Sequence, residues 1–188
     1  MANMGRYRKA IQIGIFAIVI VIAGLTIANN LFFKEPAQRL IKAGESARSF
    51  ELPSLDGSTI KLAQYDGKTV LLNFWASWCE PCRQEMPDLQ AQYDKWRDQG
   101  VVVLGVNVAE NKVTAGAYVQ QLGLNFPVVL DQNQDVRKKY GVYNYPSSIF
   151  IGADGKVGKV IEGQMNAAMI DNVLTELTAK AKGKGVRS

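Results

Sequence analysis

The two cysteines are the residues of this sequence whose type and spacing point most directly to chemistry. Cys79 and Cys82 are the only cysteines in the 188-residue chain, and Glu80 and Pro81 lie between them. Two intervening residues allow one turn of chain to bring the sulfurs within bonding distance, so the pair can alternate between dithiol and disulfide. An apolar run over residues 70–75 precedes the motif and helical spacing follows it. A thiol at such a strand-to-helix junction lies near free backbone N–H groups and the positive end of the helix dipole, which favour the thiolate. We interpret the pair as a redox site.

Other uses of a cysteine pair fit the composition less well. A structural zinc site usually needs four Cys or His ligands, and this sequence has two Cys and no His. A c-type haem attachment site needs His directly after the second cysteine, where this chain has Arg83. An inert structural disulfide stays open as the alternative, although closing so short a loop adds little stability. The absence of His also excludes Ser-His and Cys-His catalysis. We expect no metal, and no cofactor beyond the Cys79–Cys82 couple itself.

The N-terminal part of the chain is apolar enough to suggest a membrane anchor. The apolar stretch over residues 10–33 is longer than the roughly 20 residues that a helix needs to cross a bilayer. Because Arg6, Arg8 and Lys9 precede it, the positive-inside rule predicts that residues 1–9 are cytoplasmic and that the rest lies on the outer side. We expect a single-pass signal-anchor at 10–33.

A cleaved signal peptide is the alternative for this stretch, and Thr26 and Ala28 form a small-residue cleavage pattern. The stretch is longer than the roughly 7–15 apolar residues of a signal peptide, which favours the anchor. A charged tether over 34–45 would then lead to the folded domain. Either interpretation exports that domain from the cytoplasm.

The net charge of +5 comes from the two ends of the chain. Between residues 34 and 179 acidic residues slightly outnumber basic ones, whereas residues 182–188 form a basic tail. A nucleic-acid-binding protein concentrates its basic residues on the folded domain, so we expect no nucleic-acid partner.

The rest of the chain alternates between strand and helix patterns. An Asp56-Gly57 turn signal between short β-like segments predicts an N-terminal β-hairpin. Alternating strands and helices that end in a hairpin and a helix predict a three-layer α/β domain over residues 46–181. The expected strands are 69–75, 101–108, 126–130, 147–151 and 156–161, and the expected helices are 83–98, 114–122, 135–140 and 167–181.

The segment from Phe74 to Cys82 closely resembles the active-site segment of thioredoxin-fold proteins, and Tyr145-Pro146 looks like the cis-proline loop of that family. The resemblance covers about residues 46–180 and implies a thioredoxin-like sandwich with a central mixed sheet flanked by helices. The long segment between the two motifs and the apolar N-terminus resemble the TlpA/ResA branch of extracytoplasmic thiol-disulfide oxidoreductases. The Cys-Glu-Pro-Cys tetrad is similar to that of the ResA type in particular.

This resemblance implies clients and an electron donor. Members of the branch reduce disulfides in apocytochrome c before haem attachment and are reduced by a membrane thiol transporter of the CcdA type. We therefore expect a membrane-anchored protein-disulfide reductase that serves cytochrome c biogenesis. Two alternatives stay open: the same fold reducing other exported proteins, such as spore or cell-envelope clients, and a non-catalytic thioredoxin-like binding module.

The motif residues take roles that fit this chemistry. Cys79, at the helix N-terminus, is expected to attack the client disulfide, and Cys82, one turn inside, to resolve the mixed disulfide. Pro81 is tolerated because its missing N–H has no intrahelical partner in the first turn. The carboxylate of Glu80 is expected to raise the pKa of Cys79 and to make the pair a reductant. Trp78, next to Cys79, is expected to line the client surface together with Pro81.

One position departs from the thioredoxin pattern. Thioredoxins carry a buried Asp on the strand before the motif, and Asn73 stands at the matching position. Since Asn accepts no proton at neutral pH, another base must serve, and Glu110 resembles the glutamate that ResA-type proteins place near the cysteines. Tyr145, before the predicted cis-Pro146, is expected to shape the client groove, and simple packing is the alternative.

Overall fold

The computed structural model describes the backbone of residues 4–32 and 39–185, and the side chains of residues 11–26 and 39–181. The chain divides into two units, Met1–Gln38 and Arg39–Ser188. The described part of the first unit is the helix α1 (Met4–Phe32). Within the described residues, no helix combines the length and apolar character that crossing a bilayer requires. Residue 33 of the expected anchor, residues 34–38 of the expected tether and residues 186–188 of the expected tail lie outside the described part.

The second unit is built on a five-stranded mixed sheet with the order β5-β4-β3-β6-β7. The three strands β3, β4 and β5 are parallel, whereas β6 runs antiparallel to β3 and β7 antiparallel to β6. The strands are β3 (Thr69–Trp75), β4 (Val101–Val108), β5 (Val128–Asp131), β6 (Ser147–Ile151) and β7 (Val157–Glu162). All residues of β3 and β4 are buried, as expected for central strands covered on both faces.

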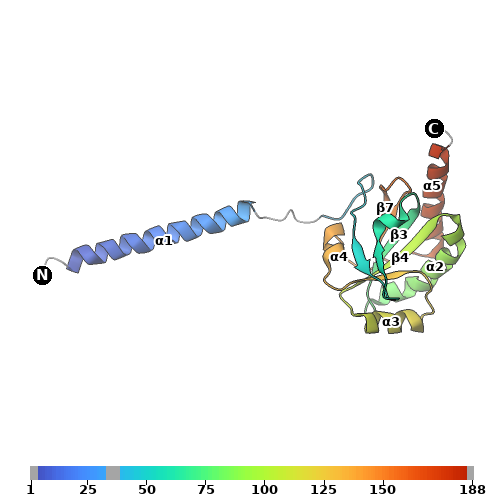
Figure 1. Ribbon diagram of the computed structural model, residues 1–188, viewed down its shortest axis with the longest axis horizontal. Coiled ribbons are helices and arrows are strands. Elements are labelled where there is room, and N and C mark those ends of the chain that lie inside the picture. Colours follow the sequence, from blue (N-terminus) through green and yellow to red (C-terminus); the bar gives the residue numbers. More distant parts are fainter. Residues whose placement is uncertain (1–3, 33–38, 186–188) are drawn as a thin grey trace. The chain divides into compact units, whose positions relative to one another are not determined.

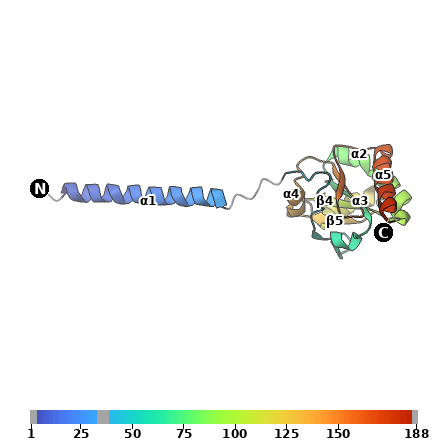
Figure 2. The ribbon, with the colours of Figure 1, turned by 90° about the horizontal axis from the view of Figure 1, so that it is seen from above.

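Helices and a β-hairpin cover the two faces of this sheet. One core contains side chains from α2 (Glu80–Trp96), α3 (Lys112–Gln121) and α5 (Ala167–Gly185). The other contains side chains from α4 (Asp135–Tyr140) and from the hairpin β1 (Glu51–Pro53) and β2 (Thr59–Lys61). Figure 1 shows α4 on one side of the sheet and α2 and α5 on the other, and Figure 2 shows the same unit from above. Two 3₁₀ turns complete the elements, Leu62–Tyr65 and Arg97–Gln99. The thioredoxin-like sandwich with an N-terminal hairpin is thus confirmed.

The folded unit begins earlier than residue 46. Ile41 is only 1% exposed and packs in the core beside α4, and its N–H donates to the carbonyl of Tyr140 at 3.0 Å. The segment passes so close to Gly141 that a Cβ there would lie 2.3 Å from the carbonyl carbon of Arg39. Gly141 also has φ +69°, a conformation that favours glycine. Residues 39–45, expected to be part of the tether, therefore belong to the domain.

Most helix and strand boundaries agree with the expected ones to within three residues. The helix expected at 83–98 starts at Glu80 because Cys79 caps it, and it changes into the second 3₁₀ turn after Trp96. The helix expected at 167–181 continues to Gly185, so the first residues of the expected basic tail are helical.

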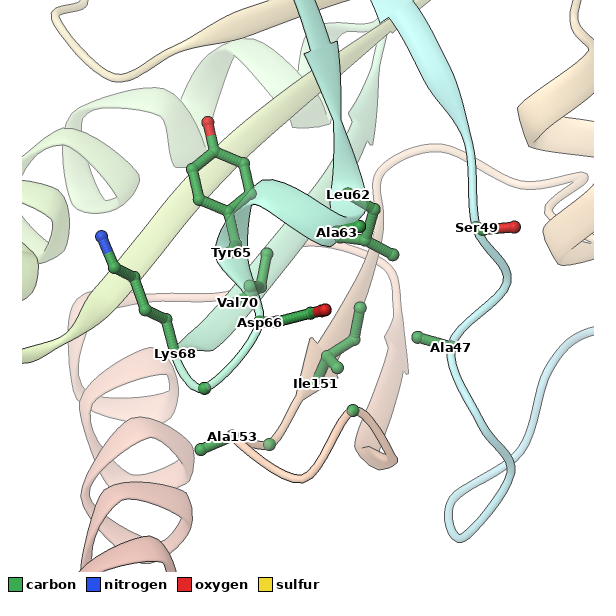
Figure 3. A pocket seen from close by; sticks show the side chains of 13 residues that line it. Ala47, Ser49, Leu62, Ala63, Tyr65, Asp66, Lys68, Val70, Ile151 and Ala153 are labelled. Atoms are coloured by element: carbon green, nitrogen blue, oxygen red, sulfur yellow. The ribbon is translucent and has the colours of Figure 1, made fainter.

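A hollow of about 180 Å³ opens at the end of the sheet where β3 begins. Figure 3 shows that side chains from separate segments surround it, among them Ala47, Leu62, Val70 and Ile151. Since the cysteines follow the other end of β3, this hollow is separate from the redox motif.

Candidate active site

Cys79 and Cys82 form a disulfide at the N-terminus of α2. Cys79 is the N-cap residue, and its Sγ accepts a hydrogen bond from the N–H of Cys82 at 3.2 Å. Its side chain therefore takes up one of the helix N–H groups that lack an intrahelical partner. Cys79 is 5% exposed and Cys82 is 0% exposed. Of the two sulfurs, that of Cys79 is the one a client can approach first.

An aromatic pair adjoins the disulfide. Trp78, which immediately precedes Cys79, is 66% exposed, and its ring meets that of Tyr145 edge to face at 5.7 Å. The Tyr145–Pro146 peptide bond is cis, as the resemblance implied. Burial raises the pKa of Tyr145, and the neighbouring Arg137 opposes this shift. The cis-proline loop thus lies beside the redox motif, and Trp78 offers apolar surface there.

Glu80 and Pro81 form the first turn of α2, and both are exposed. The carboxylate of Glu80 accepts a hydrogen bond from Gln84 Nε2 at 3.4 Å. A carboxylate at a helix N-terminus is stabilised by the dipole, and here it also lies next to Cys79 in sequence. Its expected effect on the thiol stays a prediction.

Glu110 lies after β4 and holds the loop that carries the cysteines. Its carboxylate accepts hydrogen bonds from the backbone N–H of Ser77 at 2.9 Å, from the Ser77 hydroxyl and from Asn107 Nδ2 at 2.6 Å. The preceding residue, Ala109, has φ +63°. These three hydrogen bonds join the loop to the end of β4. The geometry gives Glu110 a role in positioning Ser77, two residues before Cys79, and its expected role as a base stays a prediction.

The structure adds a site residue that the sequence analysis missed. Glu85, one helical turn after Cys82, is 0% exposed. Burial raises its pKa to about 7. The hydrogen bonds that it accepts from the N–H of Met165 and from the amide of Asn73 act in the opposite direction and lower the pKa. Asn73, at the position where thioredoxins have Asp, therefore hydrogen-bonds to a carboxyl on the neighbouring helix. A buried carboxyl with such a pKa can exchange protons at neutral pH.

The wall behind the motif is aromatic. The ring of Trp75, at the end of β3, stacks on Tyr118 of α3 with centroids 5.2 Å apart. Gly105 of β4 makes room for Trp75, since a Cβ there would lie 2.9 Å from its Nε1. This packing fixes the end of β3 from which the redox loop emerges.

A thioredoxin-like sheet, a disulfide at a helix N-terminus and an adjoining cis-proline loop define a thioredoxin-fold redox protein. The family model for AhpC/TSA proteins matches residues 43–160. The thiol-disulfide oxidoreductase ResA of Bacillus subtilis is 38% identical over 167 residues, which cover 89% of this chain and 92% of that protein. ResA of Halalkalibacterium halodurans is 35% identical over 176 residues, or 94% of this chain and 98% of that protein.

Solved structures agree with these relatives. A thiol:disulfide interchange protein of the thioredoxin family from Chlorobium tepidum matches with a TM-score of 0.66 and 29% identity, covering 73% of this chain and 98% of that one. StoA from Bacillus subtilis matches with a TM-score of 0.60 and 28% identity, covering 67% and 96%. The chain belongs to the AhpC/TSA family and, within it, to the ResA-type thiol-disulfide oxidoreductases. Its CxxC motif holds the Cys79–Cys82 disulfide.

Proposed function

We propose that the protein is a reductant of disulfides in exported proteins, and that its clients include apocytochrome c before haem attachment. Its similarity to ResA proteins supports the reaction class. The observation that carries the proposal is the asymmetry of the couple. Cys79 adjoins the exposed Trp78 and the cis-proline loop, whereas Cys82 is fully buried. Such an arrangement suits attack by one thiol and resolution by the other.

In the proposed reaction the Cys79 thiolate attacks a client disulfide and releases one client thiolate. The Cys82 thiol loses its proton, and its sulfur attacks the Cys79 sulfur in the mixed disulfide. The second client thiolate then leaves with the electron pair of the broken bond. Two electrons pass to the client, and the Cys79–Cys82 disulfide remains.

The proton of the Cys82 thiol needs a local acceptor because Cys82 is shielded from solvent. Glu85 fits this role: it follows Cys82 by one turn on the buried face of α2, and its pKa is raised to about 7 by burial. We assign it the resolving step, while Glu110 positions the loop on the Cys79 side.

The proposal includes a cellular setting. The anchor at 10–33, an active domain on the outer side and re-reduction by a CcdA-type thiol donor are predictions from the sequence and its resemblance. The clients and this donor are the proposed partners, together with the membrane itself.

Trapping tests the client and the cysteine roles together. In a reduced Cys82→Ser variant the first attack still occurs and resolution does not, so incubation with disulfide-bonded apocytochrome c is expected to yield a covalent adduct at Cys79. Cys79→Ser is the matched control and should give no adduct. Mass spectrometry of non-reduced tryptic peptides identifies the bond.

Other outcomes of the trapping experiment separate the alternatives. Adducts with other exported proteins but none with apocytochrome c would favour the alternative clients. No adduct with any disulfide would favour a non-catalytic module.

The reduction potential tests the direction of electron flow. We expect a value nearer to that of thioredoxin, about −270 mV, than to that of DsbA, about −120 mV. Glu80→Gln removes the anion beside the thiols and is expected to shift the potential to a less negative value. Equilibration with glutathione buffers measures both proteins. An unchanged potential would show that Glu80 does not tune the couple.

A further inference from the structure

The side-chain amide of Asn73 joins two elements inside the core. Asn73 is 0% exposed, and its Nδ2 donates to Oε1 of Glu85 on α2 and, at 3.0 Å, to Oγ of Ser148 on β6. Both amide hydrogens are therefore used. The amide oxygen, Oδ1, is buried and has no hydrogen-bond partner among the residues that the structure describes.

The other oxygen of Glu85 is fixed from a third direction. Its Oε2 accepts the backbone N–H of Met165 at 2.9 Å, just before α5. Asn73 of β3, which donates to the carboxyl, is neutral, and so is Ser148 of β6, which accepts from the Asn73 amide. On α2 itself, Asp88 is the charged residue whose field acts on Glu85. Cys82, which becomes a titratable thiol when the disulfide is reduced, lies one turn before Glu85.

A carboxyl that cycles between two protonation states needs a partner that fits both. The anion requires a donor at Oε1, and the neutral acid, if protonated there, requires an acceptor. A primary amide supplies either one, since a half-turn of its terminal group exchanges N–H for C=O at the same place. The Ser148 hydroxyl both donates and accepts, so it stays compatible with either orientation. An aspartate at residue 73 would offer only acceptors when ionised.

We propose that Asn73 is a positioning residue whose amide reverses when Glu85 gains a proton, and so holds the carboxyl beside Cys82 in both protonation states. This rests on the proposed role of Glu85 as the acceptor of the Cys82 proton. When Cys82 resolves the mixed disulfide, its thiol proton passes to the Glu85 carboxylate and its sulfur bonds to that of Cys79. Glu85 then returns the proton to a released client thiolate.

Side-chain labelling of the oxidised full-length chain tests this with Asn73 in place. Infrared difference spectra follow the carboxylic-acid C=O band of Glu85, which Glu85→Gln identifies by its loss. NMR follows the labelled Asn73 side-chain amide. We expect both signals to change with one midpoint near pH 7. Titration of Glu85 without any change at the Asn73 amide would overturn the proposal, as would an absence of Glu85 titration between about pH 5 and 9.

Substitution of Asn73 adds a measurement, the titration midpoint of Glu85, that would not change if Asn73 had a purely structural role. Asn73→Asp places two carboxyls within hydrogen-bonding distance, so they share a proton and the Glu85 midpoint is expected to rise by about one pH unit or more. The pH profile of client reduction should shift with it. Asn107→Asp is the matched control, because Asn107 is also buried and donates to another carboxylate, Glu110. It should leave the Glu85 midpoint unchanged.

A failure of the Asn73 proposal can be distinguished from a failure of the proposed function. Client trapping by Cys82→Ser depends on Cys79 alone, so it can succeed while the amide of Asn73 stays fixed. An Asn73→Asp variant with the midpoint and pH profile of the unmodified chain would show that Asn73 only packs.

Discussion

At the scale of single residues, Glu85 combines its proposed chemical role with a cost to folding. Its side chain is fully buried, and burial raises its pKa from about 4.5 to about 7. Between these two values the folded protein binds a proton that the unfolded chain has released. Stability is therefore lost as pH rises from about 4.5 to 7, and the loss is complete above pH 7. The shift corresponds to about 3 kcal/mol.

Glu85→Gln is expected to remove this loss. Below about pH 4.5 the two proteins should have similar free energies of unfolding, and by pH 8 the variant should be the more stable by up to about 3 kcal/mol. Urea denaturation of both proteins in the oxidised form across this pH range measures the difference. A constant difference at all pH values would show that Glu85 does not titrate near neutrality.

The same variant should resolve mixed disulfides slowly, because the Cys82 proton loses its acceptor.

Glu110 allows a contrasting prediction. Its three donors tie Ser77 to the end of β4, so Glu110→Ala should release the loop and slow client attack by Cys79. Since Glu85 lies on a different element, its midpoint near pH 7 should be retained. Stopped-flow rates across pH distinguish the two effects. If the pH midpoint of the rate moved instead, Glu110 would be acting as a proton acceptor, as the sequence analysis expected.

At the scale of elements, the segment before the hairpin is attached to α4 at several points. The hydroxyl of Tyr140 donates to the carbonyl of Arg48 at 2.7 Å, and Lys139 Nζ donates to that of Ser49 at 2.5 Å. On the other face, Asp171 of α5 accepts from Lys95 at 2.6 Å and from Trp96 Nε1 at 2.9 Å, which joins α5 to α2. Both contacts tie a peripheral element to one that packs on the sheet.

Gly141→Ala tests the attachment at α4. The new Cβ would meet the backbone at Arg39, and alanine disfavours the φ of +69°. We expect destabilisation by more than about 2 kcal/mol and faster proteolysis of residues 39–48. Thermal unfolding and limited proteolysis measure these effects. Gly155→Ala, at a similar φ but in open space, is the control and should cost less.

At the scale of the whole molecule, the domain boundary has a measurable consequence. A fragment of residues 39–188 should fold and keep disulfide exchange, because the second unit contains both cores. A fragment of residues 46–188 loses Ile41 and should be less stable by at least about 2 kcal/mol. Equal stability of the two fragments would place the boundary at residue 46.

The proposed orientation of the chain can be tested in cells. If the domain is on the outer side, an impermeant thiol reagent should label Cys79 in intact, reduced cells. Labelling only after lysis would contradict the anchor orientation. A Cys79→Ser chain provides the background signal.

The sequence predicts the central strands well because β3 and β4 are continuous apolar runs that need no knowledge of their neighbours. It also predicts the redox motif, since two cysteines and a proline carry the signal. In the sequence, residues 39–45 look like part of a tether because the segment is charged and has few apolar residues. The burial of Ile41 comes from tertiary contacts, among them those with α4. Glu85 was missed although a signal existed: it lies three residues after Cys82 and four before Leu89, on the face of α2 that both occupy. A charged residue on such a face marks a functional candidate.

The placement of Glu85 on α2 affects how the site tolerates change. Because Cys82 and Glu85 are one turn apart on the same helix, the helical screw itself sets their separation. Substitutions that let α2 shift against the sheet alter the polarity around both groups, but they move the pair as one rigid body. The distance of the proposed proton transfer is therefore little affected by changes in the surrounding core. Among homologues with repacked cores, we expect the pH at which resolution is fastest to vary. The maximal rate of resolution should vary less.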